Sequence, residues 1–292
     1  MTQRKKLTDL VFKDNFMFGA VMTEEENCRL FLEMVLGFCI EKVVVSREKS
    51  IAYHPEYKGV RLDVFAKDSS QKCYNVEMQV ARKPELGRRA RYYRGQIDME
   101  LLLTGMGYEQ LPDTYIIFIC DFDPFEKQRY CYTFESRCME EDFPIADGSR
   151  VIFLNTHGNN PQEVSQSMVK FLNFVRADLE GSSADFQDSL VGRLQNSIRR
   201  IKTDREMEAR YMLLQELIQD ERNEAREEGK EEGMIQGKIE MILDLLEDLG
   251  TVQEEVHDRL TQETDPEVLK KIFKLAKRAN SMEEFTEAIQ SV

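Results

Sequence analysis

Alternating hydrophobic and polar positions mark two neighbouring strands in the first third of the chain. The pattern runs over residues 60–67, where Val, Leu, Val and Ala occupy the even positions, and returns over residues 74–80. A period of two is typical of strands that bury one face. Residues 68–71 between them are turn-like. The pattern therefore predicts an antiparallel hairpin.

The register of this hairpin decides which side chains meet. Setting Val64 opposite Val76 joins the apolar residues of the two strands. The same register sets Asp63 opposite Glu77, whereas a slip of one residue would bury the wrong face. Two adjacent carboxylates repel each other unless a cation or a proton joins them. Mg2+ fits this role because it takes oxygen ligands and keeps waters, although solvated acids on a polar strand face are the simpler interpretation.

The remaining pattern of residues 1–180 predicts a mixed α/β domain. A continuous apolar run at Thr114–Cys120 indicates a strand that is buried on both faces. Further strands are predicted at residues 42–47, 129–135 and 151–155, and helices within residues 7–37, at 88–106 and at 161–177.

The chain changes character at Gly181-Ser182-Ser183, where we place a domain boundary, with a helical tail over residues 184–292. The pattern there predicts one long helix from Phe186 to about Gly233, followed by a small helical bundle. Glycines at 229, 233 and 237 indicate either the close approach of a partner helix or a break near Gly233. The apolar stripes need a partner surface, either in the same chain or in a second copy, and we expect a homodimer through these helices.

A basic stretch follows the hairpin, with a single acid among its six Lys and Arg residues between 82 and 94. Arginine forms paired hydrogen bonds with phosphate, and exposed tyrosine stacks or donates. The alternative is a solvated helix face with its aromatic residues in the core, and we expect this of one of the two tyrosines. The predicted phosphate contacts are Arg61, Arg82, Lys83, Arg88, Arg89, Arg91 and Tyr92.

The distribution of charge is uneven. The net charge of −14 divides into +3 for residues 1–100, −6 for residues 101–200 and −11 for residues 201–292. An acidic chain repels nucleic acid at long range. Because most of the acid lies in the tail, we expect a modest, salt-sensitive affinity for DNA.

Several classes of protein are disfavoured by the sequence. No apolar run is long enough to span a membrane, and residues 1–14 do not have a signal-peptide pattern, so a cytoplasmic protein is expected. The six cysteines lack C-x-x-C spacing, which favours reduced thiols over zinc or disulfides. No Walker-type or G-x-G-x-x-G loop is present.

Short motifs in order along residues 7–160 carry a resemblance to a known family. The chain resembles the Rpn branch, the recombination-promoting nucleases or putative transposases, of the PD-(D/E)XK nuclease superfamily. This resemblance implies a restriction-endonuclease-like mixed sheet flanked by helices. The matching pieces are Phe12-Lys13-x-x-Phe16, Phe31-Leu32, Leu36-Gly37, Arg61-Leu62-Asp63-Val64, Asn75-Val76-Glu77-Met78-Gln79, Arg91-Tyr92-Tyr93, Gly105-x-x-Tyr108 and Tyr115-Ile116-Ile117-Phe118-Ile119.

The resemblance implies a DNA endonuclease that hydrolyses phosphodiester bonds with Mg2+ (or Mn2+), linked to recombination or mobile elements. Asp63 and Glu77 would bind one or two metal ions, with the backbone carbonyl of Met78 or Val80 as a further ligand. Gln79 would orient the attacking water. A second class remains open: an inactive nuclease-like module that binds nucleic acid or protein and assembles through its helical tail.

The third position of the superfamily motif is usually lysine, and this chain has Gln79 there, as the Rpn branch does. An amide orients by hydrogen bonds but supplies no positive charge. The source of a cationic helper is therefore open, with Arg61, Arg82 and Lys83 as nearby candidates. Glu33 on the first helix is either an accessory metal ligand or a solvated helix residue.

Overall fold

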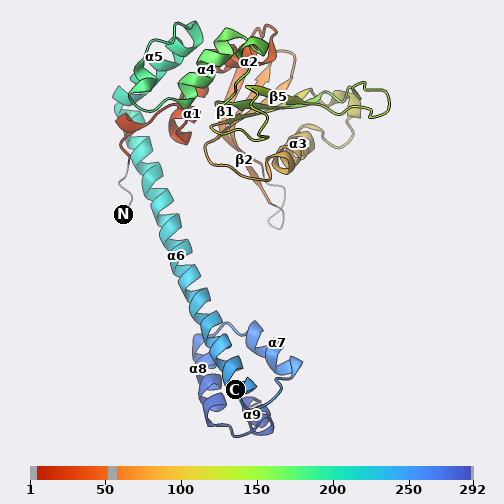
Figure 1. Ribbon diagram of the computed structural model, residues 1–292, viewed down its shortest axis with the longest axis vertical. Coiled ribbons are helices and arrows are strands. Elements are labelled where there is room, and N and C mark those ends of the chain that lie inside the picture. The colour runs from red at the N-terminus through yellow and green to blue at the C-terminus, as the bar shows by residue number, and fades with distance from the viewer. Residues whose placement is uncertain (1–4, 52–57, 291–292) are drawn as a thin grey trace. The chain divides into compact units, whose positions relative to one another are not determined.

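A computed structural model of the chain describes residues 5–51 and 58–290. These residues form two compact units that divide between Tyr211 and Met212, within one long helix (Figure 1). The sequence places the domain boundary earlier, at Gly181–Ser183. The helix that follows this stretch, α5 (Ser189–Thr203), packs with the first unit, against α1 (Asn15–Met22), α2 (Glu25–Leu36) and α4 (Gln166–Arg176).

The first unit is built on a six-stranded mixed sheet with the order β1-β2-β3-β4-β6-β5. β1, β2 and β3 are antiparallel to one another, β3, β4 and β6 run parallel, and β5 is antiparallel to β6. The fold is that of a restriction-endonuclease-like α/β domain, as the resemblance implies. The strands are β1 Val43–Ile51, β2 Val60–Asp68, β3 Cys73–Gln79, β4 Thr114–Cys120, β5 Cys131–Phe134 and β6 Ser149–Asn155.

Helices cover both faces of this sheet. α3 packs on one face through Leu86, Ala90, Tyr93 and Ile97, whose helical spacing makes one apolar stripe. α1 and α2 pack on β1 from the face of the sheet opposite α3. α4 packs against α2, and α5 packs against both α1 and α2. The bounds are η1 Leu7–Asp9, α1 Asn15–Met22, α2 Glu25–Leu36, α3 Leu86–Leu101, η2 Tyr108–Gln110, η3 Pro161–Glu163, α4 Gln166–Arg176, η4 Gly181–Ser183 and α5 Ser189–Thr203.

The predicted register of the β2–β3 hairpin is confirmed, since Val64 pairs with Val76. The expected polar face is wrong, however. Every residue of β3 is buried, because α3 covers the side on which Asn75, Glu77 and Gln79 lie. The period-two pattern shows which strand positions are polar, but it does not show that a helix further along the chain covers the polar face.

The single helix predicted from Phe186 to about Gly233 is also wrong. α5 ends at Thr203, and α6 (Arg205–Glu247) begins after Asp204, whose side chain accepts from the Glu206 N–H at 2.8 Å. α6 then continues through all three spaced glycines, and open space surrounds each of them within the described chain. An exposed helix therefore tolerates these glycines at a cost of about 1 kcal/mol each relative to alanine.

The second unit is a small helical bundle around one apolar cluster. The end of α6 contributes Ile239, Ile242 and Leu246 to this cluster. The partners come from α7 (Glu254–Gln262), α8 (Pro266–Arg278) and α9 (Met282–Ile289). Ser281 caps α9 by accepting a hydrogen bond from the Glu284 N–H, as its position before the last apolar stripe suggests.

Two expectations from composition can be compared with this fold. All six cysteines lie in the described residues and are free thiols, with Cys28, Cys73 and Cys120 buried. Across residues 5–51 and 58–290, none of the helices has both the length and the apolar character that crossing a membrane requires.

Candidate functional site

Asp63 and Glu77 lie where the β2 and β3 strands diverge. The paired ladder stops at Val64 and Val76, and beyond it the carboxylates replace the missing backbone partners. The Asp63 N–H donates to Glu77 Oε1 at 3.1 Å, and the Met78 N–H donates to Asp63 Oδ2 at 3.1 Å. On the neighbouring strand Glu48 opposes this point with a positive φ of 52°. These reciprocal bonds hold the two acids side by side.

Glu77 is fully buried, with donors on both carboxylate oxygens. Asn75, two residues earlier on the same face of β3, donates its Nδ2 to Oε1 at 3.2 Å, and Arg89 donates from α3 to Oε2 at 3.2 Å. The Oδ1 of Asn75 is buried without a hydrogen-bond partner in the described structure.

The environment disfavours two negative charges at this point. Burial, and then the charge of Asp63, raise the pKa of Glu77 to about 8, against the opposing effects of its hydrogen bonds and of Arg89. Burial also raises the pKa of Asp63, although the Met78 N–H favours its charged form. Displaced pKa values of this kind are typical of functional carboxylates. A metal ion would replace the proton that the pair otherwise retains.

Gln79 and Arg89 form the next layer of the site. Arg89 donates to Gln79 Oε1 at 3.2 Å, while its Nε donates to the Tyr93 hydroxyl at 2.6 Å. The guanidinium also lies 5.0 Å from the centre of the Tyr93 ring. Arg89 and Tyr93 are four residues apart on α3, a spacing that places them on one helix face. The sequence assigned Arg89 to DNA phosphate and did not find its contact with Glu77.

A hollow of about 260 Å³ opens onto these groups. Besides Asp63, Gln79 and Arg89 it is lined by Lys83 and by Asn15, the first residue of α1. The segment before α1 is held by Lys13, which donates to Asp121 at 2.7 Å and to the Arg176 carbonyl at 3.1 Å. Asn15 was not predicted, because only the fold brings α1 to the carboxyl end of β3. Met78, Val80 and Ala81 complete the lining.

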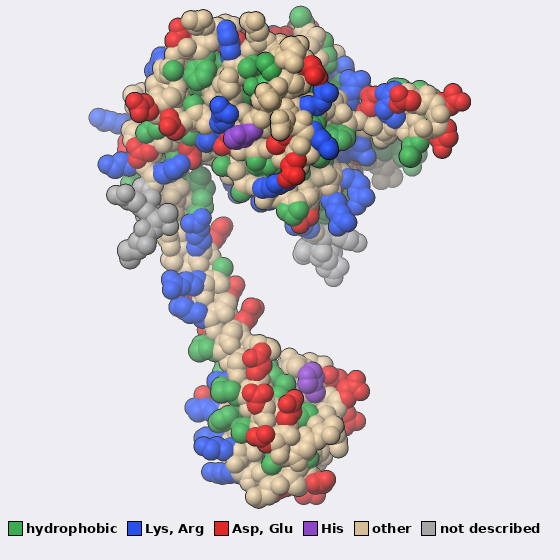
Figure 2. All heavy atoms as spheres, viewed as in Figure 1, with side chains coloured by type: hydrophobic (Ala, Val, Ile, Leu, Met, Phe, Trp, Pro, Cys, Tyr) green, Lys and Arg blue, Asp and Glu red, His purple; other side chains and the backbone are tan. Residues whose placement is uncertain are grey.

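Among the predicted phosphate contacts, Arg61 and Arg82 are exposed but already paired with acids. Arg61 pairs with Glu48 at 2.8 Å and Arg82 with Glu126 at 2.5 Å. Lys83, Arg88 and Arg91 are exposed. Figure 2 shows Lys and Arg side chains interspersed with acidic ones over the first unit in this view.

The tyrosines and Glu33 have different surroundings. Tyr92 is 38% exposed and its hydroxyl donates to the Lys58 carbonyl, whereas Tyr93 is buried in the core under α3. Glu33 accepts from Arg29 at 2.7 Å and from the Ile40 N–H at 2.8 Å. These contacts fix the end of α2 to the following loop, and the structure does not bring Glu33 into the hollow.

The donor set at the hollow matches a hard divalent cation. Within residues 5–51 and 58–290, no three His, Cys, Asp or Glu side chains gather as a metal cluster, so Asp63 and Glu77 would be the two side-chain ligands. Mg2+ is usually bound by one or two carboxylates, with waters and substrate phosphate completing its shell. The buried, proton-retaining pair therefore fits such an ion better than it fits two free charges.

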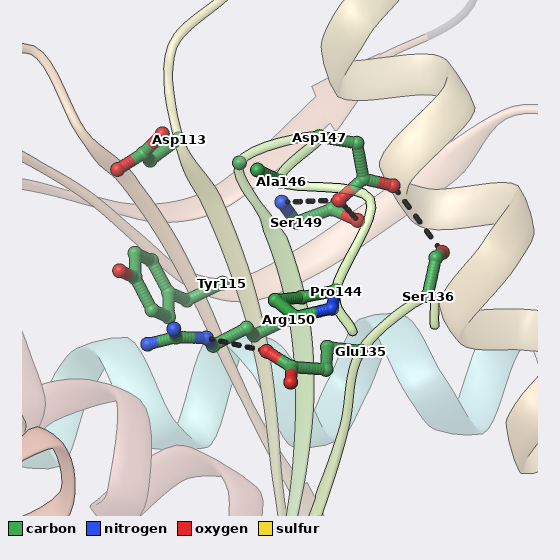
Figure 3. A pocket seen from close by; sticks show the side chains of 10 residues that line it. Asp113, Tyr115, Glu135, Ser136, Pro144, Ala146, Asp147, Ser149 and Arg150 are labelled. Carbon is green, nitrogen blue, oxygen red and sulfur yellow. Dashed lines mark hydrogen bonds and ion pairs between the residues drawn. The ribbon is translucent and has the colours of Figure 1, made fainter. Parts of the chain in front are cut away.

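A second hollow of similar size lies at the opposite end of the parallel strands (Figure 3). It lies at the start of β4 and β6, and its acids already have partners. Glu135 pairs with Arg150 at 3.6 Å, and Asp147 accepts from the Ser149 N–H at 3.0 Å and from the Ser136 hydroxyl at 3.3 Å. Ordinary loop contacts thus account for these acids.

Comparisons with known proteins give one match. A search of curated proteins found no match, and neither did a search of solved structures. The family model described as PD-(D/E)XK nuclease family transposase matches residues 6–228. That range contains the whole sheet, both acids of the pair and α3. With this match over most of its length, the chain belongs to the PD-(D/E)XK nuclease family transposases.

Proposed function

We propose that this protein is a Mg2+-dependent DNA endonuclease whose metal ligands are Asp63 and Glu77. The observation that carries the proposal is the interlocked acid pair, in which Asp63 lines an open hollow and the buried Glu77 accepts a hydrogen bond from the Arg89 guanidinium. Family membership supports a nuclease with a role in mobile elements. A buried acid pair next to cations suits the binding of a metal ion together with a phosphate.

The roles follow from the positions of the groups. Asp63 and Glu77 would hold the ion, with the Met78 carbonyl as a further ligand. When bound, the ion supplies a water of lowered pKa and neutralises phosphate charge. Gln79 would orient the water through its amide, since its side chain lies beside Glu77 at the hollow. Exposed Lys83, Arg88 and Arg91 would contact the DNA backbone.

The direct test is a plasmid-nicking assay with purified protein, with and without Mg2+. Asp63→Asn retains the side-chain shape and an oxygen for the Met78 N–H but removes the charge, and Asp63→Ala removes both. Both variants should lose Mg2+-dependent cleavage by at least about a thousandfold, because the ion loses a ligand.

Glu41→Gln is the matched control for removal of one acid, since Glu41 is exposed and lies outside the hollow. Undiminished nicking by Asp63→Ala would refute the assignment of Asp63. Binding of DNA without cleavage under every metal condition would favour the non-catalytic module instead. Sedimentation of the same preparations tests the expected homodimer through the tail.

A further inference from the structure

Arg89 is placed as a cation between the two functional residues of β3. Its two terminal nitrogens reach Glu77 Oε2 and Gln79 Oε1, each at 3.2 Å, and its Nε is fixed by the Tyr93 hydroxyl. The other arginines and lysine considered as helpers lack this geometry. Arg61 and Arg82 are paired with Glu48 and Glu126, and Lys83 lines the hollow.

The hydrogen bonds of Glu77 make Arg89 a competitor for a metal ion. A carboxylate offers about two lone pairs on each oxygen. Those of Oε1 are engaged by the Asp63 N–H and by Asn75, so Oε2 is the oxygen that remains for a ligand. Arg89 donates to that oxygen. A divalent ion and the guanidinium would place positive charge at the same oxygen and repel each other.

The side chain of Arg89 is suited to moving away. It is 29% exposed and lines the hollow, whereas Glu77 beneath it is fully buried. Its anchor, Tyr93, lies one helical turn further along α3, so rotation of the outer part of the side chain can turn the guanidinium toward the hollow. A DNA phosphate there would offer it a paired, charge-assisted acceptor in place of Glu77.

We propose that Arg89 is a positioning residue that occupies the acid pair when metal is absent and transfers to a DNA phosphate when metal binds. This inference rests on the proposed function, because it takes Asp63 and Glu77 as the metal ligands. It assigns to Arg89 the positive charge that Gln79 does not supply. The inference also predicts that metal and DNA bind cooperatively, because each ligand lowers the free-energy cost of releasing Arg89 from Glu77. Such coupling is reciprocal, so each ligand raises the affinity for the other by the same factor.

The first test measures Mn2+ binding to the full-length protein by calorimetry without DNA. Arg89→Met removes the competitor but keeps an unbranched side chain, and it should bind Mn2+ about tenfold more tightly than wild type, because one charge-assisted bond no longer has to break. Arg88→Met is the matched control, because it removes the same charge from an exposed neighbour on α3. Equal changes in the two variants, or weaker binding by Arg89→Met, would overturn the inference.

The second test repeats the titration with a short phosphorothioate duplex, which resists hydrolysis. Wild type and Arg150→Met, a control in the opposite hollow, should bind Mn2+ several-fold more tightly with the duplex than without it. Arg89→Met should show a much smaller gain than Arg150→Met. Tyr93→Phe keeps the charge of Arg89 but removes its anchor, and it should shift Mn2+ affinity in the direction of Arg89→Met by a smaller factor. Thermal melts check that each variant is folded.

The outcomes separate this inference from the proposed function. Competition by Arg89 without any plasmid cleavage would leave the inference intact and overturn the nuclease assignment. Mg2+-dependent cleavage with Mn2+ binding that is indifferent to Arg89 would do the reverse. Absence of Mn2+ binding in wild type and in every variant would overturn both.

Discussion

The carboxylates at two hollows, which lie at opposite ends of the same parallel strands, differ in their burial and in their pKa values. At the carboxyl end of β3, Glu77 is fully buried and its pKa is raised to about 8, first by burial and then by Asp63. At the start of β6, Asp147 is partly exposed. Its limited burial opposes the charge, but hydrogen bonds from Ser149 and the charge of Arg94 prevail and lower its pKa.

The difference indicates which property distinguishes the candidate metal-binding acids from ordinary surface acids. The two hollows have equal volumes of about 260 Å³, but three carboxylates line the one at the start of β6, whereas Asp63 alone lines the one at the end of β3, with Glu77 buried next to it. Of these acids, the pair at the end of β3 has pKa values that burial raises, so that a metal ion could take the place of a proton there. The charge of Asp147 is already stabilised by hydrogen bonds from the Ser149 N–H and hydroxyl (Figure 3). Desolvation, rather than the number of acids, distinguishes the candidate site.

The largest predicted contrast concerns cleavage. Glu77→Gln should reduce Mg2+-dependent nicking by about a thousandfold or more, because it removes one of the two proposed metal ligands. Asp147→Asn should change the rate less than about twofold, since its bonds are structural. A plasmid assay at saturating Mg2+ compares them. A large loss in Asp147→Asn together with a small loss in Glu77→Gln would reverse the functional order of the two hollows.

The second contrast concerns stability against pH without metal. Because the pKa of Glu77 is higher in the folded than in the unfolded protein, folding favours the protonated carboxyl. This contribution to the free energy of unfolding is fully present below the unfolded-state pKa and is lost as the pH rises toward about 8. Glu77→Gln should therefore gain stability relative to wild type between pH 5 and 9, by on the order of 3 kcal/mol. Asp147→Asn should show the opposite sign, with its relative loss disappearing in acid. Denaturant unfolding from about pH 2 to pH 9 measures both, since Asp147 titrates below its ordinary pKa, and parallel pH profiles for wild type and Glu77→Gln would contradict the prediction.

The third contrast concerns protons released on metal binding. Because the pKa of Glu77 is about 8, it holds a proton at pH 7 that a metal ion must displace. Mn2+ binding should release up to about one proton at pH 7 and fewer at pH 9, and affinity should rise up to about tenfold per pH unit below 8. Calorimetry in buffers of different ionisation enthalpy counts the protons. Asp147→Asn should leave the count unchanged, and a count that is independent of pH in wild type would contradict the raised pKa.

The smallest expected effect concerns the basic residues. Lys83→Met, in the hollow that Asp63 lines, should weaken duplex binding and reduce the dependence of log affinity on log salt by about one unit. Arg150→Met, in the Asp147 hollow, should leave that slope unchanged, since Arg150 is paired with Glu135. Fluorescence anisotropy at several salt concentrations compares them, and equal slopes would remove Lys83 from the DNA interface.

Local patterns in the sequence determined the strands and the hairpin register. The apolar alternation favoured the pairing of Val64 with Val76, and this pairing brings Asp63 close to Glu77 just beyond the last paired residues. The end of α2 was equally local, since Gly37 adopts a φ of +75° that favours glycine. The motifs also sufficed to indicate the family.

Tertiary packing decided the character of the site. α3 buried the face that alternation had marked as polar, and this burial raises the pKa of Glu77. The fold also brought Arg89 to Glu77 and Asn15 to the hollow. A residue's neighbours along the chain cannot report these contacts, because they arise between elements far apart in sequence. The sequence by itself thus determined which acids pair, and the tertiary structure decided how costly their charges are and which cation meets them.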